Sequence, residues 1–177
     1  MPKPESFDEL LDATRALLAE GEGSSDLWTA NAHINDALLQ RPKAGDAWIL
    51  KSQVLSSLGD DFASLAAAAM AVQTLEDNSE ALYVRATVLA DLERHEEALA
   101  DINSALNTIG TDAWLLEDIY FERGMMLDAL GRTEDAMASF EEGISHFPDS
   151  VLLKSAIEPL HRERRRHRFR VIDGGHA

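Results

Sequence analysis

The sequence predicts an all-α protein, a right-handed α-solenoid of about four helical hairpins followed by a C-terminal capping helix. Two observations support this prediction. Apolar and small residues recur at helical spacing in pairs of segments that are joined by short turns. These pairs recur along the chain, at about residues 7–44, 45–78, 79–112 and 117–150. A hairpin of this kind leaves one apolar face open, so neighbouring copies must stack to bury it.

The clearest repeat lies in residues 117–150. Tyr120, Gly124 and Leu127 fall on one face of its first helix, and Gly131 is placed to end that helix. Pro148 is placed to stop the second helix. The inner face of this second helix is expected to hold four residues: Ala136, Phe140, Gly143 and Ile144.

Three earlier segments repeat the pattern with decreasing regularity. Residues 79–112 repeat both faces, with Leu82, Ala86, Leu89, Ala98, Ile102, Ala105 and Leu106. Residues 45–78 begin with Trp48, Ser52 and Leu55, but Asp61 and Phe62 leave the register of the second helix open by one residue. Residues 7–44 match more loosely, because the stretch GEGSS lengthens the turn.

The repeat resembles the tetratricopeptide repeat family. Its pattern is an aromatic residue, a small residue four positions later, a large apolar residue three further on, then A-x3-F and a closing proline. In residues 117–150 these positions hold Tyr120, Gly124, Leu127, Ala136, Phe140 and Pro148. The resemblance covers about residues 7–150. It implies a scaffold that binds protein or peptide partners.

Two segments lie outside the four repeats. The four residues Ala113–Leu116 precede the last repeat and are expected to add a turn to its first helix, with Asp112 as the N-cap. After Ser150, a stripe of Leu153, Ala156, Ile157 and Leu160 predicts the capping helix, in which Pro159 is a potential kink or break. We therefore expect a repeat domain with its cap in residues 1–160 and a basic C-terminal tail in residues 161–177.

Charge is distributed unevenly along the chain. Residues 161–177 hold six arginines against Glu163 and Asp173, a net charge of +4, so residues 1–160 carry −20 of the total of −16. The tail arginines are Arg162, Arg164, Arg165, Arg166, Arg168 and Arg170. An acidic body repels nucleic acids and anionic lipids, which are polyanions, and it permits a basic partner.

Composition also limits the chemistry. With no cysteine, the chain has no disulfide, thiol nucleophile or thiolate metal site. No secretory signal and no apolar run of about 18 residues is visible, so we expect a cytoplasmic protein without a membrane span. Glu158 and His161 have a spacing found in metal sites, but no second pair supports them. We therefore expect no catalytic set, no metal and no cofactor.

The resemblance implies that the first helices line an inner groove that takes an extended peptide or a helix. The candidate groove residues lie beside the packing stripe of each first helix: Asp46, Ile49, Gln53, Glu80, Tyr83, Thr87, Asp118, Phe121, Glu122 and Met125. Large apolar side chains here alternate with carboxylates, which predicts a basic or basic-apolar ligand and disfavours the capture of acidic chaperone tails. The alternative is that these side chains pack locally between repeats.

Other functions remain open at this point. The size and acidity also suit a small secretion-type chaperone, and the arginine-rich tail could bind nucleic acid against the repulsion of the acidic body. The tail could instead dock on an acidic surface of the same chain or of a neighbouring copy. Alternatively, it is a solvated chain end.

Overall fold

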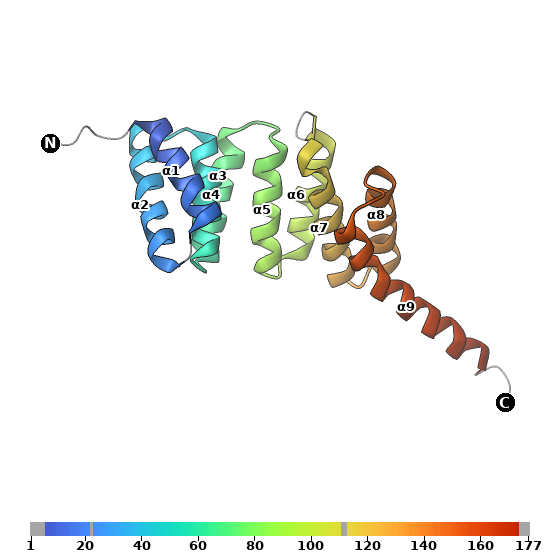
Figure 1. Ribbon diagram of the computed structural model, residues 1–177. Helices are drawn as coiled ribbons and strands as arrows, with labels where there is room; N and C mark the ends of the chain where they lie inside the picture. The colour runs from blue at the N-terminus through green and yellow to red at the C-terminus, as the bar shows by residue number, and fades with distance from the viewer. Residues whose placement is uncertain (1–5, 22, 111–112, 174–177) are drawn as a thin grey trace. The chain divides into compact units, whose positions relative to one another are not determined.

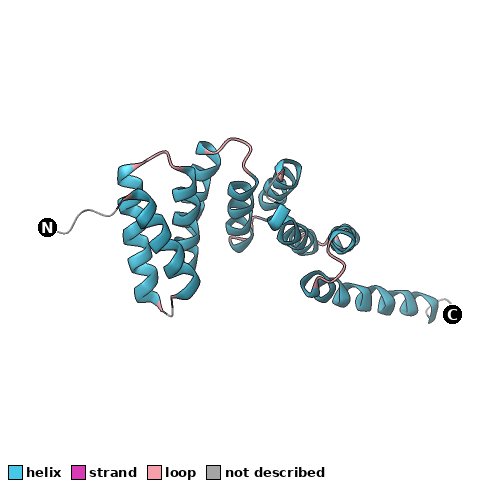
Figure 2. Cartoon of the chain, turned by 45° about the horizontal axis from the view of Figure 1, so that its top comes forward, coloured by secondary structure: helices cyan, strands magenta, loops and turns pink. Residues whose placement is uncertain are grey.

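The computed structural model describes residues 6–21, 23–110 and 113–173. Within these ranges all regular structure is helical and no strand occurs (Figure 2). The all-α fold built from repeated helical hairpins is thereby confirmed. The chain divides into two compact units, Met1–Thr108 and Ile109–Ala177, which are described separately below.

The first unit contains three helical hairpins (Figure 1). They are α1 (Phe7–Glu20) with α2 (Ser24–Gln40), α3 (Gly45–Ser57) with α4 (Asp61–Thr74), and α5 (Ser79–Asp91) with α6 (His95–Thr108). Each second helix also packs on the next first helix, α2 on α3 and α4 on α5. The first helices touch one another, α1 with α3 and α3 with α5, and so form a continuous layer.

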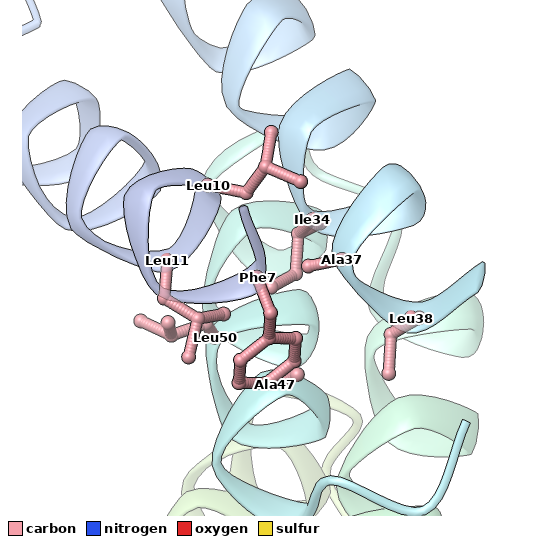
Figure 3. Packing of buried hydrophobic residues seen from close by; sticks show 8 residues of the cluster. All are labelled: Phe7, Leu10, Leu11, Ile34, Ala37, Leu38, Ala47 and Leu50. Atoms are coloured by element: carbon pink, nitrogen blue, oxygen red, sulfur yellow. The ribbon is translucent and has the colours of Figure 1, made fainter. Parts of the chain in front are cut away.

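The hairpins are held together by apolar clusters that span neighbouring repeats. In Figure 3, side chains from α1, α2 and α3 point toward one another; they are Phe7, Leu10, Leu11, Ile34, Ala37, Leu38, Ala47 and Leu50. A second cluster joins α3, α4 and α5 through Ile49, Ala68, Ala71, Ala81 and Val84. Burial of these side chains supplies most of the stabilisation, at about 25 cal/mol for each Å² of apolar surface.

The register of α4, which the sequence left open by one residue, is decided by its cap and its partner. The Asp60 side chain accepts a hydrogen bond of 3.1 Å from the Ala63 N–H, so α4 begins at Asp61. Ser64 is then buried, and its hydroxyl donates to the Ser52 carbonyl at 2.8 Å. Phe62 faces outward with 79% of its surface exposed.

The second unit consists of a short 3-10 helix, η1 (Ala113–Leu115), and three α-helices: α7 (Leu116–Ala129), α8 (Thr133–His146) and α9 (Val151–Asp173). Gly131 makes the turn between α7 and α8 with a φ of 72°, a conformation that favours glycine. The expected extra turn before this hairpin is present, but of residues 113–116 only Leu116 belongs to the α-helix. Ala113–Leu115 form a tighter 3-10 turn that leads directly into α7 and buries the Leu115 side chain. Asp112 lies outside the described residues.

Helix α9 caps the second unit, but it is longer than its apolar stripe. Leu153, Ile157 and Leu160 are buried, and α9 packs on α8 and α7. The helix passes through Pro159 without a break and continues to Asp173, so the expected boundary between cap and tail falls inside one helix. Pro159 has no backbone N–H to donate to the carbonyl of Ser155, four residues earlier. Because Ser155 is exposed, water can bond to this carbonyl instead, which explains why the helix tolerates the proline.

Candidate functional site

The layer of first helices in unit Met1–Thr108 contains a cavity of about 210 Å³. It is lined by Arg15 from α1, by Asp46, Ile49 and Leu50 from α3, and by Glu80 from α5. The structure therefore brings together three of the residues that the sequence predicts for the groove, namely Asp46, Ile49 and Glu80. The cavity involves all three hairpins of this unit, which gives it a defined position on the layer.

Local helix physics accounts for the two carboxylates in this cavity. Asp46 and Glu80 both lie in the first turn of their helices, where a negative side chain interacts favourably with the helix dipole. Because α3 and α5 pack side by side, their first turns deliver both carboxylates to the same cavity. The repeat therefore places acidic groups at equivalent positions on neighbouring helices.

Arg15 is a cavity residue that the sequence analysis missed. It follows the buried Thr14, as Gln53 follows Ser52 and Thr87 follows Ala86, so applying the same offset to the first repeat would have found it. Its guanidinium Nη1 lies 3.0 Å from the Asp12 Oδ1, an ion pair within α1. The cavity therefore combines two carboxylates with one cation, and that cation is already paired with Asp12.

The apolar candidates on α3 and α5 pack between repeats. Ile49 is only 3% exposed and belongs to the cluster that joins α3, α4 and α5. Tyr83 is half-buried against the same cluster. Both side chains therefore pack locally between repeats, which is the alternative that the sequence left open. Ile49 still lines the cavity, but with only a small part of its surface.

The polar candidates Gln53 and Thr87 are also half-buried. The Thr87 hydroxyl donates to the Val84 carbonyl at 2.9 Å, which leaves only its acceptor lone pairs for a ligand.

In the second unit the candidates form one face of α7. Asp118, Phe121 and Glu122 are half-buried, and Met125 is exposed. The Phe121 ring lies 6.3 Å from the ring of Phe140 on α8, so it is anchored to the core on one side. Burial raises the pKa of Asp118, and the neighbouring charge of Glu117 raises it further. A cation bound beside Asp118 would offset both effects.

The described arginines of the basic segment make weak ion pairs, two within α9 and one with α8. The Arg162 Nε and the Arg165 Nη2 lie 3.7 and 3.6 Å from the Glu158 Oε1 of the same helix. The Arg164 Nε lies 3.4 Å from the Glu134 Oε1 of α8. All three side chains are exposed, and pairs of this kind contribute about 0–1 kcal/mol each. Arg166, Arg168 and Arg170 belong to α9, but their side chains lie outside the described part of the chain.

Two kinds of site are not found in the described part of the chain. No group of three or more His, Cys, Asp or Glu side chains there is arranged to hold a metal ion. None of its helices combines the length and the apolar composition that a membrane crossing requires.

Comparison with known proteins identifies the repeat. Residues 117–149 match the family described as tetratricopeptide repeat. No curated protein sequence matches the chain.

Solved structures with a similar fold include a thermophilic TPR protein of Thermus thermophilus, with a TM-score of 0.75 at 16% identity over 89% of this chain and 82% of that one. MamA from Desulfovibrio magneticus RS-1 has a TM-score of 0.75 at 12% identity over 92% and 88% of the two chains. YrrB, described as a TPR protein with an unusual peptide-binding site, has a TM-score of 0.68 at 18% identity over 90% and 78%.

Proposed function

We propose that the chain is a non-catalytic scaffold that binds a basic or basic-apolar segment of a partner protein, because its last repeat matches the tetratricopeptide repeat family and its fold is similar to that of a TPR protein. In this proposal residues 1–160 form the binding domain with its cap, and residues 161–177 are a basic C-terminal segment. The protein acts in the cytoplasm, without a cofactor. The repeat fold is that of protein-interaction scaffolds, which supports the general part of the proposal.

The observation that carries the proposal is the cavity between α1, α3 and α5. Its volume of about 210 Å³ suits one long side chain rather than a whole small molecule, since small-molecule sites usually measure about 300–1,000 Å³. Asp46 and Glu80 bring two carboxylates to it from neighbouring helices, against the single guanidinium of Arg15. An incoming Lys or Arg side chain could pair with these carboxylates, whereas an acidic side chain would be repelled.

The exposed face of α7 supports the apolar part of the ligand preference. Met125 is 46% exposed there, beside the half-buried Phe121, Asp118 and Glu122. A segment with alternating basic and apolar side chains would match this mixture of surfaces. YrrB, a protein of similar fold, is described as having a peptide-binding site, which is consistent with the proposal.

A charge-reversal variant tests the cavity. We expect Asp46→Lys combined with Glu80→Lys to weaken the binding of a labelled peptide of alternating Arg and Leu by about tenfold or more, because two attractive contacts become repulsive. Fluorescence anisotropy titration measures this change. A peptide with Glu in place of Arg should bind the unaltered protein poorly and this variant better.

The matched control is Glu20→Lys combined with Asp36→Lys. It makes the same change in net charge at exposed sites of unit Met1–Thr108 that do not line the cavity. We expect this control to weaken the binding of the basic peptide by less than about threefold at 0.15 M salt, because screening reduces the attraction between distant charges. If both variants lose the same affinity for the peptide, the effect comes from net charge alone, and a specific binding site is contradicted.

A further inference from the structure

The described start of the basic segment of α9 has little cover from its own unit. Leu160 is the last buried residue among the described side chains of α9, and residues 162–165 are exposed, although the helix continues to Asp173. In Figure 1 this part leaves the α7–α8 hairpin. An isolated helix of about a dozen residues is only marginally stable in water, so most helices depend on packing against a neighbour. Among the described side chains of unit Ile109–Ala177, residues 162–165 therefore contribute exposed ion pairs and no buried packing.

The first unit has a groove on the side of α4, α5 and α6. A cavity of about 440 Å³ lies between α4, α5 and α6. Its apolar lining is Leu65 and Ala69 of α4, Leu89 of α5 and Ala100 of α6. This groove is separate from the cavity between α1, α3 and α5, since no residue lines both.

The outward face of α4 makes this groove suitable for a helix. Its exposed residues at helical spacing are Phe62, Ala66, Ala69 and Gln73. Helix α4 is therefore apolar on its outer as well as its inner face, and a helix of that kind is normally covered on both sides. The exposed alanines leave a shallow trough into which another helix could pack closely, with Phe62 standing at its end.

The charged residues that line the groove are paired with one another, two arginines with two carboxylates. Arg85 holds Asp101 in a bidentate pair, with both N–O distances at 2.6 Å. Arg94 holds Glu97 in the same way, with both distances at 2.7 Å. Both cations that line the groove are thus already neutralised.

Two further carboxylates lie close to the groove. Asp61 is one turn before Leu65 on the same face of α4, and Asp91 is close enough to Asp61 to sense its charge. Burial raises the pKa of Asp91, and Asp61 raises it further. No ion pair of Asp61 or Asp91 occurs among the described residues. A basic helix laid in the trough would therefore meet carboxylates that lack a cation.

We propose that residues 161–172 of one copy dock in the groove between α4 and α6 of a second copy. The segment carries six arginines, and the body carries −20, so the two surfaces are complementary in charge. Long arginine stems can cover the alanine trough while their guanidinium groups reach Asp61 and Asp91. Phe169, Val171 and Ile172 supply apolar groups for the same surface. Reciprocal exchange of the two segments closes a dimer.

Light scattering on the full chain tests this proposal. At about 50 mM salt we expect twice the monomer mass of 19.5 kDa, and at about 500 mM salt a dissociation constant at least about tenfold weaker, since screening removes the ionic contacts. The segment variant R164E/R165E/R168E and the groove variant D61K/D91K should each be monomeric at low salt. An equimolar mixture of the two variants should form a mixed dimer. In it the acidic segment of the first variant docks in the basic groove of the second, and the unaltered segment of the second docks in the unaltered groove of the first.

Two controls make the result specific. Glu20→Lys with Asp36→Lys changes the net charge elsewhere on the first unit, and Asp46→Lys with Glu80→Lys changes the other cavity; both variants should remain dimeric. Circular dichroism checks that every variant is folded. The proposal is overturned by a monomeric parent protein at low salt, by a segment variant that stays dimeric, or by a mixture that stays monomeric. It is also overturned if association depends on the segment only after RNA is added.

Discussion

Replacing Phe140 with alanine is expected to lower the free energy of unfolding by about 3–5 kcal/mol, the usual cost of truncating a fully buried phenylalanine. Phe140 is only 1% exposed and lies at the centre of the α7–α8 hairpin. Its ring faces the Phe121 ring at 6.3 Å and fills the space beside Gly124. Removing the ring leaves a cavity between two helices that the rest of the hairpin cannot easily close.

Urea denaturation followed by circular dichroism measures this change. The control is Glu141→Ala, an exposed neighbour on the same helix, which should alter stability by no more than about 0.5 kcal/mol. If Phe140→Ala costs less than about 1 kcal/mol, the hairpin is not packed around this ring, and the assigned register of α8 is wrong.

Introducing a side chain at Gly124 is the second large effect. A Cβ atom at this position would overlap the ring of Phe140, so even alanine requires the ring to move. We expect Gly124→Leu to destabilise the protein by about 1–3 kcal/mol, as overpacking usually does, and Gly124→Ala to be destabilising in the same direction. This is opposite to the gain of about 0.8–1.0 kcal/mol that alanine brings over glycine in an open helix.

A double-mutant cycle separates the two contributions. In the Phe140→Ala background the ring is absent, so Gly124→Ala should become neutral or stabilising by up to about 1 kcal/mol. The free energy of unfolding of the four proteins is compared by urea denaturation. If Gly124→Ala changes the free energy of unfolding equally with and without Phe140, the Phe140 ring is not the reason for glycine at this position.

The sequence by itself determined the helices and their pairing. Helical spacing of apolar residues and stop signals such as Gly131 and Pro148 are local properties, and α7 and α8 follow them closely. The spacing also placed Gly124 and Phe140 on the packing faces of their two helices, and the structure shows that the Phe140 ring lies against Gly124. The acidic positions Asp46 and Glu80 could be placed on one surface because the repeat assigns them equivalent positions on neighbouring helices.

Only the tertiary structure decided which of the residues beside the packing stripes are buried. Ile49 sits beside the packing stripe of α3, and the sequence allowed it to face either a ligand or the next repeat; the side chains of α4 and α5 bury it. The groove between α4 and α6 has no signal in the sequence, because its lining comes from three helices and includes residues as inconspicuous as Ala69 and Ala100. Periodicity shows which face of a helix is apolar, but burial depends on what the neighbouring repeat places against that face. The same distinction applies to α9, whose apolar stripe ends at Leu160 while the helix continues to Asp173, since backbone hydrogen bonds extend a helix beyond the residues that pack it.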